Sequence, residues 1–145
     1  MPDILAACNR FVTADGRGTE CFSRVFGSEG LEADVKVAWE ADVLVGVHGS
    51  GLNNMHLMRE GTSVIEIRPC GAPPFLETHF EAMALSGHPV HVWVLQLERG
   101  LGPGPDPCRP GRLEALGAGD PYFWGRDRDV IPPPGAVLEL LQRAV

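Results

Sequence analysis

The sequence predicts an α/β fold in which helices flank a Rossmann-like parallel sheet. Three apolar runs, at 43–47, 63–67 and 90–97, are rich in valine, isoleucine and leucine, as buried strands are. Helix-compatible segments bounded by glycine or proline separate these runs. Strands that alternate with helices are joined by right-handed crossovers, so we expect the three strands to lie parallel in one sheet.

A helix is expected before the first strand, from Leu31 to about Asp42. Apolar residues recur there at helical spacing, and we expect them to form the face that packs on the sheet. This expected face consists of Leu31, Val35, Ala38 and Trp39. A helix that leads directly into a buried strand is typical of an α/β sheet.

The first strand ends in a glycine-rich turn, His48-Gly49-Ser50-Gly51, and a second helix is expected from there to Gly61. Gly49 and Gly51 are expected to give the backbone positive φ angles and to leave room for a ligand, because glycine has no Cβ. The first turn of a helix leaves backbone N–H groups unpaired. The turn is therefore a candidate anion site, although a turn that needs glycine only for tight packing explains the same spacing.

The remaining segments divide the chain around this core. Residues 31–98 are expected to form the Rossmann-like core, with a third helix from Phe75 to Leu85. Residues 1–30 are punctuated by glycine and are expected to be short, poorly ordered pieces. Residues 99–121 are rich in proline and glycine and are expected to be a loop without regular structure. Residues 122–145 are expected to close the fold with a helix over 135–145.

The composition of the chain excludes several classes of protein. Its 145 residues suit one domain, and the 44% hydrophobic and 21% charged fractions are those of an ordinary globular protein. The net charge of −7 argues against a nucleic-acid partner, because that binding depends on lysine and arginine. No apolar run approaches the roughly 20 residues of a transmembrane helix.

The four cysteines, Cys8, Cys21, Cys70 and Cys108, are far apart in the sequence. No C-x-x-C pair occurs, which argues against a zinc ribbon or a thioredoxin-type site. Whether they form disulfides depends on the compartment, which the sequence does not fix. We expect free or partly buried thiols.

Two motifs carry a family resemblance. V-G-V-H-G-S-G-L-N-N-M is followed about ten residues later by G-T-S-V-I-E-I-R-P, and then by the segment Phe80-Glu81-Ala82-Met83-Ala84. Their order and separation resemble the C-terminal half of glycosyltransferase family 61, whose usual pattern is H-G-A-G-L-T-N followed by V-I-E-I-x-P. The resemblance covers roughly 31–97 well and 125–145 more loosely.

The resemblance implies the C-terminal domain of a GT-B glycosyltransferase, which binds a nucleotide-sugar. We expect a UDP-sugar donor, a glycan or glycoprotein acceptor, inversion at the sugar carbon, and location in the Golgi or endoplasmic reticulum. The residues expected to hold the donor diphosphate are His48, Gly49, Ser50, Gly51, Leu52 and Asn53. The family pattern has alanine and threonine at Ser50 and Asn53, a change that a site built mainly from backbone tolerates. Because the family's N-terminal half and membrane anchor are missing, we expect a fragment or a shortened relative.

His48 and Glu66 allow several interpretations. His48 lies at the carboxyl end of a strand, where it could donate to a phosphate or sugar, act as a charge-neutralising imidazolium with a possible catalytic role, or be structural. Glu66 is costly to bury unpaired, so it could accept from ribose hydroxyls or pair with Arg68 or a backbone amide.

Other candidates are weaker. The residues after the second strand that could reach a cleft are Arg68, Glu77, Thr78 and His79. Asp127-Arg128-Asp129 has the spacing of a metal-binding D-x-D triplet, but it lies in a run of alternating charge that is typical of a solvated loop. The remaining histidines share no metal-ligand spacing, so we expect no metal site and a diphosphate held by protein groups.

Two other functions fit parts of the sequence. A non-catalytic remnant would keep the phosphate-binding turn without transferring a sugar. A hydrolase is suggested by the similarity of H-G-S-G to an esterase oxyanion loop, but the chain contains no G-x-S-x-G nucleophile motif.

Overall fold

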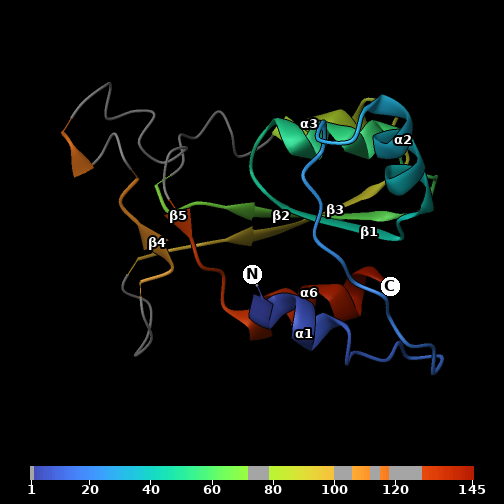
Figure 1. Ribbon diagram of the computed structural model, residues 1–145, viewed down its shortest axis with the longest axis horizontal. Helices are drawn as coiled ribbons and strands as arrows, with labels where there is room; N and C mark the ends of the chain where they lie inside the picture. Colours follow the sequence, from blue (N-terminus) through green and yellow to red (C-terminus); the bar gives the residue numbers. More distant parts are fainter. Residues whose placement is uncertain (1, 72–78, 100–105, 112–114, 118–128) are drawn as a thin grey trace.

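The computed structural model describes residues 2–71, 79–99, 106–111, 115–117 and 129–145. The predicted parallel sheet is confirmed within this part of the chain (Figure 1). Its strands, in spatial order, are β1 (Val43–Val47), β2 (Ser63–Arg68) and β3 (His91–Gln96). The central strand β2 is buried along its whole length. The three strands share one direction, so their carboxyl ends meet at the same edge of the sheet.

Helices cover both faces of the sheet, which makes a three-layer α/β fold (Figure 1). On one face, α1 (Pro2–Cys8) and α6 (Pro134–Ala144) lie against alternate residues of β2 such as Ile65 and Ile67. The other face carries α2 (Leu31–Glu40), the 3₁₀ helix η1 (Ser50–Leu57) and α3 (His79–Leu85). Because strand side chains alternate, Val64 and Glu66 lie on this second face.

The predicted core-facing side of α2 is only partly confirmed, because Ala38 is buried but the larger apolar residues are not. Leu31 and Trp39 are 76% and 57% exposed, whereas Ala38 and Asp34 are buried. Asp34 accepts hydrogen bonds from Arg24 Nη2 at 2.8 Å and from the Gly27 N–H at 2.6 Å. This carboxylate anchors the preceding segment, so the helix turns a polar residue inward, against the apolar periodicity.

Residues 2–30 are more regular than expected. They begin with a helix, α1, and continue through an isolated antiparallel bridge between Val12 and Gly18. A disulfide joins Cys8 to Cys21, and Asn9 Nδ2 donates to the Cys21 carbonyl at 3.0 Å. These constraints compensate for the glycines of the segment, which had predicted poor order.

The expectation of free thiols was wrong, because all four cysteines form disulfides. The second disulfide joins Cys70, just after β2, to Cys108. Cys108 belongs to β4 (Cys108–Arg109), which pairs with β5 (Asp129–Val130) in an antiparallel sheet beyond the arrowheads of β2 and β3 (Figure 1). The 99–121 segment therefore contains a short strand, which the proline and glycine content had argued against.

One of the expected helices differs from the structure, and another is described only in part. The segment after the glycine turn is a 3₁₀ helix that ends at Leu57, before Gly61. The third helix is described from His79, and the first part of its expected range lies outside the described residues. The closing helix and the three strands lie within one or two residues of their predicted ends. None of the described helices is long and apolar enough to cross a membrane.

Candidate functional site

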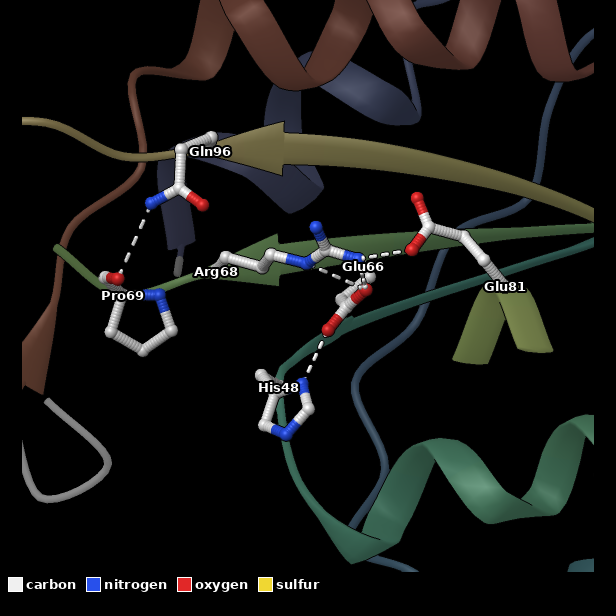
Figure 2. Close-up of polar contacts among 6 residues, drawn as sticks. All are labelled: His48, Glu66, Arg68, Pro69, Glu81 and Gln96. Atoms are coloured by element: carbon white, nitrogen blue, oxygen red, sulfur yellow. Dashed lines mark hydrogen bonds and ion pairs between the residues drawn. The ribbon is translucent and has the colours of Figure 1, made fainter. Parts of the chain in front are cut away.

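A buried cluster of charged side chains lies where β1 and β2 end (Figure 2). His48 directly follows β1, and its N–H donates to the Ile67 carbonyl at 2.8 Å, which continues the strand pairing. The His48 side chain is 8% exposed, and its Nδ1 lies in hydrogen-bond contact with Oε1 of Glu66. Glu66 is opposite Gly46 in the parallel register, and the absence of a side chain at Gly46 leaves room for Leu52.

Glu66 is fully buried and both of its oxygens have partners. Its Oε2 accepts from Arg68 Nε at 3.0 Å and from Arg68 Nη2 at 2.9 Å. These residues are two positions apart in β2 and share one face of the sheet. Of the alternatives open from the sequence, pairing of Glu66 with Arg68 is confirmed. A ribose-binding role for Glu66 does not follow from this geometry, because the carboxylate does not reach solvent.

Arg68 connects this pair to α3. Its Nη2 also donates to Glu81 Oε2 at 2.9 Å, and the Glu81 side chain is 39% exposed. Burial lowers the pKa of Arg68, but the hydrogen bonds to Glu66 and Glu81 raise it by more, so the pKa lies above its ordinary value. The guanidinium therefore stays charged and bridges two carboxylates.

Aromatic rings pack against His48 from α3. The centroid of the Phe80 ring lies 5.3 Å from the centroid of the His48 ring, and the two rings meet edge to face. The centroid of the His79 ring lies 6.4 Å from that of His48. Phe80 is buried, so it excludes water from one side of the imidazole. His79, which the sequence placed near a possible cleft, is exposed close to His48.

The glycine turn differs from the expected conformation. Gly49 has φ 161° and ψ 175°, which is extended, and Gly51 is not among the glycines with positive φ. A Cβ at Gly51 would meet no atom within 4 Å, and one at Gly49 would meet only the Val47 carbonyl at 3.8 Å. The expected positive φ angles are therefore wrong, but open space in front of both glycines is confirmed.

The residues of the turn divide between the surface and the core. Ser50, Gly51 and Asn53 are exposed, and Ser50 and Gly51 line a cavity of about 1290 Å³ that continues along β1. Leu52 is 1% exposed, and its N–H donates to the Gly49 carbonyl at 3.0 Å. Leu52 thus supports the turn from inside, and the amide predicted to hold a phosphate is already used by the protein.

The glycosyltransferase 61 family model matches residues 1–65. This range contains the whole glycine-turn motif and the first half of β2. The match supports an assignment to glycosyltransferase family 61 over this part of the chain. The assignment supports a glycosyltransferase in general, with a sugar donor and an acceptor. No curated protein matches the chain.

The family 61 match extends further toward the N-terminus than the motifs suggested. It includes residues 1–30, which the sequence had set apart as poorly defined, and it stops one residue before Glu66. The segment that carries α1, the first disulfide and the Asp34 anchor therefore lies within the matched range.

Sequence reasoning missed one member of the charged cluster, Glu81. Glu81 was quoted only as part of a motif, and its place in the first turn of α3 is given by the structure, since the sequence had placed the start of that helix at Phe75. Three other candidates, Glu77, Thr78 and Asp127, lie outside the described residues, as does Arg128. Within the described ranges, no group of three or more possible metal ligands occurs.

Proposed function

We propose that this chain binds a nucleotide-sugar, with UDP as the carrier, and provides the donor side of an inverting glycosyl transfer. The single observation that carries the proposal is the position of His48. The buried carboxylate of Glu66 holds it at the carboxyl edge of a parallel sheet, immediately before an exposed glycine turn. Open α/β sheets bind their ligands at that edge.

The glycine turn has the properties that a diphosphate needs. Ser50 and Gly51 begin η1, so their N–H groups belong to the first turn of a helix, where backbone donors attract anions. Ser50 and Asn53 are exposed and add side-chain donors. Leu52 and Gly46 fix the turn from below, so the site exists before the ligand arrives.

The chemical step explains why such donors matter. The bond between the sugar carbon and the β-phosphate oxygen breaks, and its electron pair stays on the phosphate as UDP leaves. The acceptor oxygen forms its bond to the same carbon from the opposite face, and its proton passes to solvent water. Donors aimed at the departing diphosphate stabilise its growing charge and lower the barrier.

The two disulfides support location in the secretory pathway. Disulfides persist in oxidising compartments and are rare in the cytosol. All four cysteines are paired, and both disulfides lie in well-packed regions of the fold. A glycan or glycoprotein acceptor in the Golgi or endoplasmic reticulum is consistent with that environment.

The test is a titration of the whole chain with UDP, followed by thermal unfolding. Binding to the folded state at 100 times Kd stabilises it by about 2.7 kcal/mol, so the unfolding temperature should rise with UDP concentration. Gly51→Val fills the open space in front of the turn and should abolish the rise. Gly135→Val is the matched control, because Gly135 also has open space and lies in the first turn of α6. No stabilisation of the wild type at millimolar UDP would refute the proposal.

A further inference from the structure

One edge of the parallel sheet, formed by β1, has unpaired backbone groups. β1 is an outer strand, because the described sheet has the order β1-β2-β3. The Asp42 carbonyl and the His48 N–H bond to β2, so the backbone groups of every second residue point toward β2. Those of Val43, Val45 and Val47 point the other way. No described residue forms a hydrogen bond to the N–H or C=O groups of these three valines.

The cavity of about 1290 Å³ runs along this free edge. Every residue of β1 lines it, with Arg59 at the amino end of the strand and Ser50 at the carboxyl end. Its volume exceeds the roughly 300–1,000 Å³ of small-molecule pockets, so the space suits a longer ligand. An extended backbone matches the spacing of the donors and acceptors on a strand edge. The cavity therefore suits a polypeptide segment that adds a strand to the sheet.

Segment 19–26 forms the opposite wall of the cavity. It passes from the layer of α1 and α6 to the layer of α2, across the direction of the strands (Figure 1). The Cys8–Cys21 disulfide holds its first part, and the ion pair of Arg24 with Asp34 holds its last part. This wall bars the sheet of a second copy, which would bring its own helices to the edge. A single extended segment fits between the wall and β1.

The two layers of the fold define the side chains that such a segment carries. Val43, Val45 and Val47 pack with the cluster of α1 and α6, and Leu44 packs with the cluster of α2 and η1. A neighbouring strand directs its side chains alternately into these two apolar layers. Apolar, β-branched residues therefore fit, as they do in buried parallel strands.

The rim of the cavity favours a segment with basic ends. Each arginine that lines the cavity already forms an ion pair with an acidic residue. Among the described residues, three exposed carboxylates of the lining have no such partner, namely those of Glu20, Glu40 and Glu60. Lysine or arginine beside them gives complementary charge.

Arg59 gives an independent indication of a missing partner. Its Nη2 donates to Asp42 Oδ1 at 2.6 Å, but its Nε is buried and has no hydrogen bond. Of the buried side-chain nitrogens and oxygens in the described part of the chain, this is the only one without a partner. A buried donor without an acceptor is costly, and a peptide carbonyl at this end of the cavity supplies one.

We propose that the free edge of β1 binds an extended segment of a partner protein as an additional strand of the sheet. The segment has apolar, β-branched residues at its centre and basic residues at its ends. Its backbone pairs with Val43, Val45 and Val47, and one of its carbonyls accepts from Arg59 Nε. This site goes beyond the proposed function and does not depend on it, because none of these groups belongs to the glycine turn.

Hydrogen exchange of backbone amides tests the pairing on the unaltered chain. The probe is the peptide acetyl-KVTVTVK-amide, and the control peptide acetyl-KVTPTVK-amide cannot donate at its centre. Without peptide, the amides of Val43, Val45 and Val47 should exchange faster than those of Leu44 and Gly46, which bond to β2. At about ten times its Kd, the probe should slow exchange at the three valines about tenfold, and the control should not.

Two outcomes of the exchange experiment would overturn the proposal. One is the absence of slowing at millimolar probe. The other is slow exchange at the three valines before peptide is added, and slow exchange that appears only at high chain concentration would assign the edge to a second copy instead. A chain that binds the probe and not UDP would lose the proposed function and keep this site.

Three variants locate the bound segment. Val45→Pro removes an N–H that points away from β2, a position where an edge strand tolerates proline, and should weaken probe binding about tenfold. Val45→Thr keeps the N–H and should bind within about twofold of the wild type. Arg59→Lys keeps the charge but lacks Nε, so it should bind about fivefold more weakly and remains informative if Val45→Pro fails to fold. Unchanged affinity in Arg59→Lys and in a folded Val45→Pro would overturn the proposed site.

Discussion

Gly46 lies directly beneath Leu52: a Cβ on Gly46 would be 2.7 Å from Leu52 Cδ2 and 3.3 Å from its Cγ. The contact lets the fully buried Leu52 side chain reach β1, and it sets the height of the glycine turn above the sheet. The same glycine faces Glu66 across the parallel pair. Gly46 therefore lies next to both Leu52, which holds the glycine turn, and Glu66 of the charged cluster.

Gly46→Ala should therefore destabilise the protein. The added methyl group forces Leu52 out of its packed position, and overpacking of this kind costs about 1–3 kcal/mol. Chemical denaturation measures the loss. Gly51→Ala is the control, because its Cβ meets no atom within 4 Å, and its stability should stay within about 0.5 kcal/mol of the wild type. Equal stability of both variants would contradict the close packing at Gly46.

Arg68→Met should destabilise the fold strongly. It removes the guanidinium from a fully buried carboxylate, and breaking a buried ion pair on one side costs about 3 kcal/mol. The double variant Glu66→Gln with Arg68→Met should lose less, since no unpaired charge remains. Urea denaturation of the single and double variants makes the comparison. A double variant less stable than Arg68→Met would show that Glu66 does not depend on Arg68.

The disulfides should contribute unequally to stability. The chain-entropy estimate gives about 4 kcal/mol for Cys70–Cys108 and about 3 kcal/mol for Cys8–Cys21. The difference arises because their sequence separations are 38 and 13. Paired serine substitutions followed by thermal unfolding test the order. Thiol titration of the unreduced, denatured chain should find no free cysteine, and four reactive thiols would contradict both pairings.

The acid limb of the stability curve should depend on Asp34. Its hydrogen bond from Arg24, opposed by burial and aided by the Gly27 N–H, holds the pKa of Asp34 below its ordinary value. The folded pKa lies below the unfolded one, so this contribution is complete above the ordinary pKa near 4 and is lost as the pH falls through the lower, folded value. Asp34→Asn should flatten stability over that window. Parallel acid limbs would show that Asp34 makes no such contribution.

The sequence predicted the sheet better than it predicted the site. Strand ends such as Val43–Val47 were accurate because runs of β-branched residues identify buried parallel strands without knowledge of their neighbours. The face of α2 was only partly right, with Ala38 buried as expected, because its anchor, Asp34, depends on partners ten and seven residues earlier in the chain.

Long-range contacts account for the remaining differences at the site. Glu66 was recognised as a buried carboxylate that needed a partner, and Arg68 was one of the partners considered. The contact between Glu66 and His48 connects the ends of two different strands. The periodicity of a sequence does not identify such a long-range pair. The disulfides were missed for the same reason, because cysteine spacing alone does not define connectivity.

The central claim is that the exposed start of η1 holds a diphosphate, and backbone amide spectra of the labelled chain during a UDP titration test it most directly. We expect saturable shifts of the Ser50, Gly51 and Asn53 amides together with the His48 ring, and smaller changes in α6 on the opposite face of the sheet. UDP should produce these shifts, and uridine should not. Shifts confined to other parts of the chain, or none at millimolar UDP, would contradict the account.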